Sequence, residues 1–217
     1  MRWLKFVVVL LFCSTSFAQA IDTKTILQRI RENYPEGKAV KAEYIRKTTT
    51  KIGAVMGEGQ EESASGEIFF SAPNKLRLEQ STPQKEVLVT DGHKIYWHIL
   101  SKDEVYIYDF KSQGESVQTI VNVFQGMKGM ETEFKIESKA EDKSYKLQIT
   151  PLNPQGEFSS ILLTLDEKFR VSKIAIKTIS GSITEFYLKG QQIIPPPFDG
   201  YFQFAIPEGV KVIKEAQ

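Results

Sequence analysis

Few residues in the sequence are candidates for catalysis or metal binding. The two histidines, His93 and His98, lie five positions apart in a segment with strand character. Their side chains should point to opposite faces of the strand, so they cannot share a metal ion. The carboxylate pairs at 61–62 and 103–104 fall in expected loops, where solvation accounts for them. We interpret His93 as a solvated turn residue and keep a general base as the alternative.

Motifs for nucleophiles and phosphate are missing from the sequence. No Gly-x-Ser-x-Gly motif occurs, and no glycine-rich loop precedes an expected helix. The single cysteine, Cys13, lies in a segment that we expect to be removed. We therefore expect a protein that is not an enzyme and has no catalytic residues, no cofactor and no metal. An enzyme with an unrecognised site is the alternative.

The N-terminus, MRWLKFVVVLLFCSTSFAQA, has the pattern of a secretory signal peptide. Arg2 and Lys5 precede an apolar run at 6–12, and residues 18–20 supply a small-x-small cleavage pattern. A membrane span needs about 20 apolar residues, so this run is too short to be one. We expect cleavage after Ala20 and export of the mature chain.

A lipoprotein signal with Cys13 as the acylated residue is the alternative, but Phe12 is not the small residue that such a signal places before its cysteine. The expected mature chain, residues 21–217, suits a single domain. Removing two basic residues with the signal leaves 26 basic against 27 acidic residues, a net charge of about −1. This balance argues against nucleic-acid binding. The rest of the sequence has no apolar run long enough to span a membrane, so we expect no stable membrane insertion. We also expect a monomer.

Two helices are expected. The first begins after Asp22, a capping residue, buries a stripe of Ile26, Leu27 and Ile30, and ends before Pro35. The second covers 116–124 and places Val117, Ile120, Val121 and Phe124 at helical spacing.

The rest of the chain reads as strands with period-2 alternation. Expected strands, after a first one near residue 40, are 66–71, 75–80, 86–90, 93–99, 104–109, 133–137, 145–150, 159–165, 170–179, 182–188 and a last one around 200–213. Asp91-Gly92 marks the clearest hairpin turn. An antiparallel sheet of eleven or twelve strands tends to curl or close, and short helices could plug such a curved sheet.

The opening hairpins should share one apolar face. By strand parity this face carries Ile68, Phe70, Leu76, Leu78, Ile95, Trp97, Val105 and Ile107, with the helix at 116–124 above it. Taken singly, each of these residues is typical of an ordinary core.

The stretch GEIFFSAPNKLRLEQSTPQKEVLVTDGHKIYWH resembles the signature region of the lipoprotein carrier protein LolA family. The matching positions, in order, are Gly66, Pro73, Asn74, Leu76, Leu78, Pro83, 88–92 and 95–97. The closing FQFAIPEGVKVI resembles the end of the same family. Each motif alone is weak, but their order extends over the whole mature chain.

The resemblance implies a mainly β fold with a few short helices: a strongly curved antiparallel sheet forms an incomplete barrel, and helices lid its concave face. The apolar face would then be a lipid-binding cavity for lipoprotein acyl chains, and Val117, Ile120, Val121 and Phe124 would belong to a lid helix. Implied partners are an inner-membrane lipoprotein-releasing ABC transporter and an outer-membrane acceptor. The chaperone would shuttle its cargo without hydrolysing it.

The sequence departs from the family at one position. Ala72 stands where the family commonly has an arginine that resembles a latch for the lid. The latch is then absent or supplied elsewhere. Alternatives with the same fold are a glycolipid carrier and a periplasmic lipid-sensing or interaction module.

Overall fold

The computed structural model describes residues 21–50, 62–113, 115–130, 132–153, 156–195 and 200–214. The expected signal peptide lies outside this part of the chain, as do residues 53–59, where the glycines of the sequence predict a hairpin loop. Its helices are α1 (Thr23–Asn33), η1 (Leu100–Lys102, a 3-10 turn), α3 (Phe110–Gln113) and α4 (Glu115–Phe124). Its strands are β1 (Ala39–Thr49), β2 (Glu62–Ser71), β3 (Lys75–Thr82), β4 (Glu86–Thr90), β5 (Lys94–Ile99), β6 (Glu104–Asp109), β7 (Phe134–Glu141), β8 (Ser144–Pro151), β9 (Phe158–Asp166), β10 (Val171–Thr178), β11 (Ile183–Ile194) and β12 (Lys211–Lys214).

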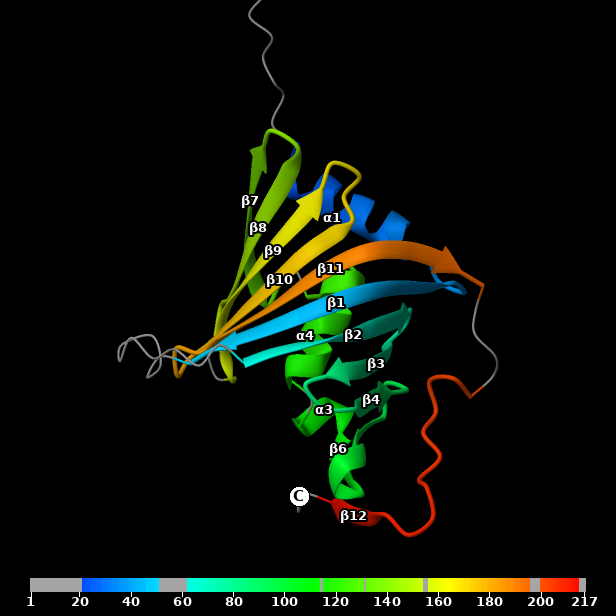
Figure 1. Cartoon of the computed structure of the whole chain (residues 1–217). Coiled ribbons are helices and arrows are strands. Elements are labelled where there is room, and N and C mark those ends of the chain that lie inside the picture. Colours follow the sequence, from blue (N-terminus) through cyan, green and yellow to red (C-terminus); the bar gives the residue numbers. More distant parts are fainter. Residues whose placement is uncertain are drawn as a thin grey trace, which may run out of the picture.

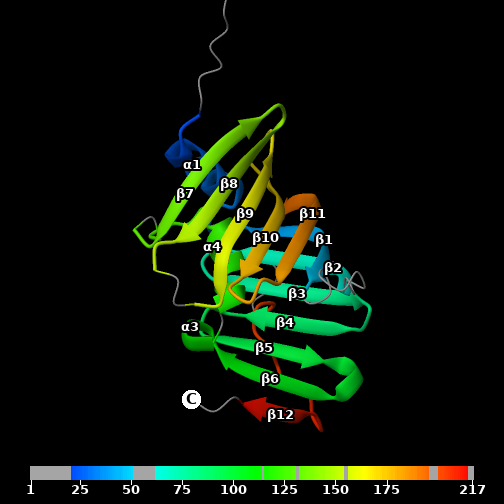
Figure 2. The ribbon, with the colours of Figure 1, turned by 90° about the vertical axis from the view of Figure 1, so that its left-hand side faces the viewer.

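All twelve strands form one sheet in the order β12-β6-β5-β4-β3-β2-β1-β11-β10-β9-β8-β7. Every pair is antiparallel except β12 with β6. The edge strands β12 and β7 lie at opposite ends of the sheet (Figure 2). The mainly β architecture with short helices is confirmed. The strongly curved, incomplete barrel is not reached, because the twist is spread over an open sheet whose two edges stay apart.

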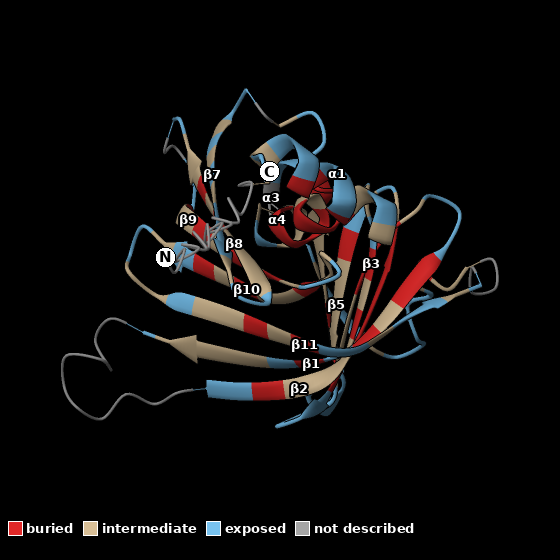
Figure 3. Ribbon diagram, turned by 90° about the horizontal axis from the view of Figure 1, so that it is seen from above, coloured by how far each residue is buried: buried red, intermediate tan, exposed pale blue. Residues whose placement is uncertain are grey.

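Both longer helices pack on one face of the sheet, which we call the helix face (Figures 1 and 3). Asp22 caps α1 by accepting a hydrogen bond of 2.8 Å from the Thr25 backbone N–H. The expected stripe of Ile26, Leu27 and Ile30 is buried, as are Ile120, Val121 and Phe124 of α4. These side chains join those of the sheet in one continuous apolar cluster.

Aromatic rings tie the two helices to the sheet. Tyr34, directly after α1, packs edge-on against Phe124 of α4, with 4.9 Å between ring centroids, and against Phe70 of β2. Its hydroxyl accepts a hydrogen bond of 2.9 Å from Val171 N–H and donates one of 2.8 Å to Gln191. Burial raises the pKa of this hydroxyl. Tyr34 therefore holds α1, α4 and strands from both halves of the sheet together.

The opposite, outer face of β2–β6 is covered by the C-terminal segment 200–210 (Figure 1). Tyr201 packs edge-on against Phe69 at 5.1 Å, and Phe204 stacks on Tyr96 at 5.6 Å. Only Lys211–Lys214 of the strand expected at 200–213 pairs with the sheet. The expected length was wrong because the aromatic side chains of this segment lie across an apolar outer face instead of continuing an edge.

Candidate functional site

The two histidines do not form a site. His93 is exposed in the β4–β5 turn, and His98 lies on the outer face, edge-on to Phe204 at 5.8 Å. Within the described ranges, no group of three or more His, Cys, Asp or Glu side chains is placed to hold a metal ion. None of the helices described is long and apolar enough to cross a membrane.

Strand register brings six of the eight expected cavity residues onto the helix face. Residues directly opposite one another in antiparallel strands share a face. One row runs from Ile68 through Leu78 and Leu88 to Trp97. The parallel row contains Phe70, Leu76, Thr90 and Ile95.

The expected facing of Val105 and Ile107 was wrong. Trp97 pairs with Tyr106, so Tyr106 and Tyr108 continue the rows on the helix face, and Val105 and Ile107 point to the outer face. Both faces of β6 carry large, partly apolar side chains, and alternation alone could not decide between them.

The expected lid residues do lie over this face. Ile120, Val121 and Phe124 are buried in the same cluster as Ile68, Phe70, Leu76 and Leu78, and Val117 packs partly buried against it. The rings of Phe124 and Phe70 stack at 4.9 Å. Ile95 and Trp97 stand outside this cluster, and Trp97 instead donates a hydrogen bond of 2.9 Å to Glu86. The expected cavity is therefore filled by α4 in this structure.

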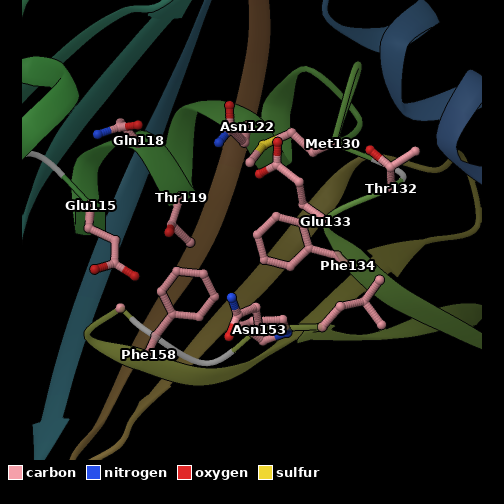
Figure 4. Close-up of a pocket in the computed structure, with 13 residues that line it drawn as sticks. Glu115, Gln118, Thr119, Asn122, Met130, Thr132, Glu133, Phe134, Asn153 and Phe158 are labelled. Atoms are coloured by element: carbon pink, nitrogen blue, oxygen red, sulfur yellow. The ribbon is translucent and has the colours of Figure 1, made fainter.

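Open volume lies on the other side of α4. A pocket of about 420 Å³ separates α4 from Met130, Thr132 and Glu133 and from β7–β9 (Figure 4). Its apolar wall consists of Met130, Phe134, Pro151, Leu152 and Phe158, and the polar lining is Glu115, Gln118, Thr119, Asn122, Thr132, Glu133 and Asn153, with Gly156 at the rim. This volume falls in the range of about 300–1,000 Å³ that is typical of ligand sites.

The pocket opens into the apolar cluster. The Phe134 and Phe158 rings stack with centroids 6.1 Å apart, and both residues pack with the cluster beneath α4. Glu115 accepts a hydrogen bond of 2.7 Å from Glu157 N–H at the start of β9. Gly156 approaches the Glu115 carboxylate so closely that a Cβ would collide with it. The sequence did not indicate this pocket, although Phe134 lies in the expected strand 133–137 and Phe158 directly precedes the expected strand 159–165.

Two hydrogen bonds fasten the C-terminal end of α4. Gln125 donates from its side-chain amide to Asn74 Oδ1 at 2.9 Å, in the β2–β3 turn. Arg31 of α1 donates from Nη2 to the Gly126 carbonyl at 3.0 Å. Gly126 has φ +57°, and a Cβ there would lie 2.6 Å from the Leu27 carbonyl oxygen. Both the positive φ and the close approach require glycine at this position.

Ala72, the expected latch position, lies beside this junction. It packs partly buried against the apolar cluster and lines a small hollow of about 130 Å³ together with Arg31 and Gln125. Arg31 of α1 therefore lies next to Ala72 in this hollow.

Comparison with known proteins decides the family. The family model described as "Outer membrane lipoprotein carrier protein LolA" matches residues 38–205. The chain belongs to the LolA family. An outer-membrane lipoprotein carrier protein of Psychromonas ingrahamii is 24% identical over 219 residues, covering 96% of this chain and 97% of that protein. The corresponding carrier of Methylococcus capsulatus is 22% identical, covering 97% and 98%.

A solved structure shares the fold. An uncharacterized conserved protein from Thermus thermophilus superposes with a TM-score of 0.50 at 10% identity, over 88% of this chain and 98% of that one. Membership in the LolA family makes this chain one of a family of carriers, in agreement with the sequence-based expectation that it is not an enzyme.

Proposed function

We propose that this protein is a periplasmic carrier that binds lipoprotein acyl chains between the helix face of the sheet and α4, and moves them from the inner to the outer membrane. The observation that carries the proposal is the pocket beside α4, whose Phe134 and Phe158 walls are continuous with the apolar cluster. An acyl chain entering there would meet the ring of Phe158, which belongs to that cluster, and the ring of Phe134, which packs against it.

The free energies of burial and hydrogen bonding support displacement of α4 from the sheet by the cargo. Each methylene removed from water contributes about 0.8 kcal/mol. The Gln125–Asn74 and Arg31–Gly126 hydrogen bonds contribute about 0.5–1.5 kcal/mol each, or somewhat more for the charged arginine. Burial of only part of one acyl chain therefore exceeds what these two fastenings contribute to closure.

In this proposal the side chains displaced from α4 are Val117, Ile120, Val121 and Phe124, and the sheet residues that receive the chain are Ile68, Phe70, Leu76 and Leu78, with Ile95 and Trp97 beyond them. The carrier receives its cargo from an inner-membrane lipoprotein-releasing ABC transporter and passes it to an outer-membrane acceptor. It acts as a single-domain monomer of residues 21–217 after signal cleavage following Ala20, and it hydrolyses nothing.

Binding of an acylated peptide to the purified mature chain tests the proposal. A synthetic peptide with an N-terminal S-dipalmitoylglyceryl cysteine should form a 1:1 complex by native mass spectrometry, while the same peptide without acyl chains should not. The mature protein isolated from the periplasm should also carry co-purified acylated material. Absence of any complex with the acylated peptide would contradict the proposal.

A further inference from the structure

The pocket beside α4 carries more polar chemistry than an acyl chain needs. Glu115 and Glu133 contribute carboxylates to its lining, and no lysine, arginine or histidine is among the thirteen described residues that line it. Neither glutamate makes an ion pair with a described residue, although Glu115 accepts the Glu157 N–H. The pocket therefore presents negative charge beside an apolar wall.

A third polar group lies deeper. Thr119 is only 4% exposed, yet it lines the pocket, and its side chain points into it from α4 (Figure 4). No hydrogen bond links its hydroxyl to any side chain or backbone group in the described ranges. The residue is almost entirely buried, but its hydroxyl oxygen keeps some accessible surface toward the pocket, so without a protein partner it is available to a ligand bound there. A bound ligand with a carbonyl oxygen would satisfy it.

These groups together indicate the chemical features of a ligand that would fit the pocket. The stacked Phe134 and Phe158 rings provide apolar and cation-attracting surface, Thr119 offers a donor for an ester or amide carbonyl, and Glu115 and Glu133 attract a cation at the rim. Glu133 directly precedes Phe134 in the chain, and Glu115 accepts a hydrogen bond from the N–H of Glu157, which directly precedes Phe158, so each ring is linked to one carboxylate.

We propose that this pocket is a head-group subsite for acylated molecules that keep a primary ammonium near their ester-linked chains. This inference rests on the proposed carrier function and names the cargo class of that same site. The chemistry fits an acylated cysteine whose α-amine is free, and it also fits an ethanolamine phospholipid. An N-acylated cysteine lacks the ammonium and loses the contact with both glutamates.

A pair of ligands that differ only in this charge tests the subsite. The probes are a cysteinyl-serine amide bearing an S-dipalmitoylglyceryl group with a free α-amine, and the same molecule N-acetylated. Each competes with a fluorescent acyl probe for the mature protein. The free amine should bind about tenfold more tightly, the ratio that one charge-assisted hydrogen bond supplies, and 0.5 M NaCl should reduce the ratio. Dipalmitoyl phosphatidylethanolamine and its N-acetyl derivative form a second pair, and the pair with the larger ratio identifies the source of the ammonium.

Matched variants locate the effect. Glu115→Gln combined with Glu133→Gln should bring the ratio close to one, while Glu62→Gln with Glu137→Gln, at exposed positions outside the pocket, should leave it unchanged. Thr119→Val should weaken the binding of the free-amine ligand and of its acetylated counterpart equally. It should not lower the melting temperature, because the methyl group replaces a hydroxyl without a partner.

The outcomes separate the two proposals. Equal affinity of free and acetylated forms in both pairs would overturn the head-group subsite but leave the carrier function standing. Failure of every acylated probe to bind would instead contradict the carrier function. A ratio that persists in the Glu115→Gln, Glu133→Gln variant would also overturn the subsite.

Discussion

The side-chain amide of Gln125, directly after α4, donates a hydrogen bond of 2.9 Å to Oδ1 of Asn74 in the β2–β3 turn. Asn74 has φ +59° and approaches Gly92 in the neighbouring β4–β5 turn, so the acceptor is held on two hairpins at once. The C-terminal end of α4 is therefore bonded to the sheet through the β2–β3 turn, whose Pro73 and Asn74 are among the positions that resemble the family.

Gln125→Ala should loosen this end of the lid. Losing one hydrogen bond should lower the free energy of unfolding by about 0.5–1.5 kcal/mol. If closure competes with cargo, affinity for a fluorescent acyl probe should rise by about twofold to tenfold. Thermal melting and probe titration measure both quantities. Gln28→Ala is the control, since it removes an exposed hydrogen bond of α1 to Glu32 that does not touch the lid. A fall in both stability and affinity would show that the bond orders the site instead of closing it.

An arginine at position 31 and an arginine at position 72 should be alternative ways to hold the C-terminal end of α4. The resemblance to the family by itself predicts that Ala72→Arg would add a latch. The structure places Arg31 beside Ala72, so a second arginine there should repel the first and lower the melting temperature. In an Arg31→Ala background, the same Ala72→Arg change should raise it. The double-mutant cycle therefore should give an effect of opposite sign in the two backgrounds. If Ala72→Arg has the same effect on the melting temperature in both backgrounds, residue 72 does not interact with Arg31, and the latch interpretation is wrong.

The segment 111–130 should open more readily than the sheet beneath it. Gly126 and Gly129, with φ +57° and +79°, provide permissive backbone after α4, while Gly114 lies outside the described residues. Amide hydrogen exchange of α4 should be faster than that of β2 and β3 in the free protein, and bound acylated peptide should slow it. The same protection of α4 with and without the peptide would count against a lid.

Leu78→Glu tests whether the helix face is a binding surface. Leu78 is buried in the apolar cluster under α4. A face that opens for cargo can admit water around a new charge, so the variant should still fold while losing acyl-probe binding. Val89→Glu is the matched control, because Val89 is fully buried on the outer face. It should destabilise the protein, and its folded fraction should still bind. If Leu78→Glu does not fold, the position is ordinary core.

Local signals in the sequence were sufficient for most elements. The cap at Asp22 and the helical spacing of Ile120, Val121 and Phe124 predicted α1 and α4 closely, because capping and periodicity act within a few residues. The shared face of Ile68, Leu78 and Trp97 followed from the alternation along their strands. Alternation fails at β6, where Val105 is buried on one face and Tyr106 is half-buried on the other.

The pocket could not be predicted in the same way. Its lining combines Thr119 of α4 with Phe158 of β9, and only the order of strands across the sheet brings them together. The hydrogen bond at the C-terminal end of α4 depends likewise on tertiary structure, because Arg31 and Gly126 are 95 residues apart in the chain. The arginine that lies near Ala72 comes from α1. Such relationships carry no short-range signal.

Photocrosslinking tests most directly whether acyl chains bind between α4 and the sheet. A dipalmitoylated cysteinyl peptide with a diazirine in one chain would be loaded onto the mature protein, irradiated and mapped by mass spectrometry of peptides. We predict adducts on α4 and on the helix-face residues Ile68, Phe70, Leu76 and Leu78, with none on the outer-face segment 200–210. Adducts that concentrate on Tyr201 to Phe204, or that are scattered without preference over the surface, would contradict the proposed binding face.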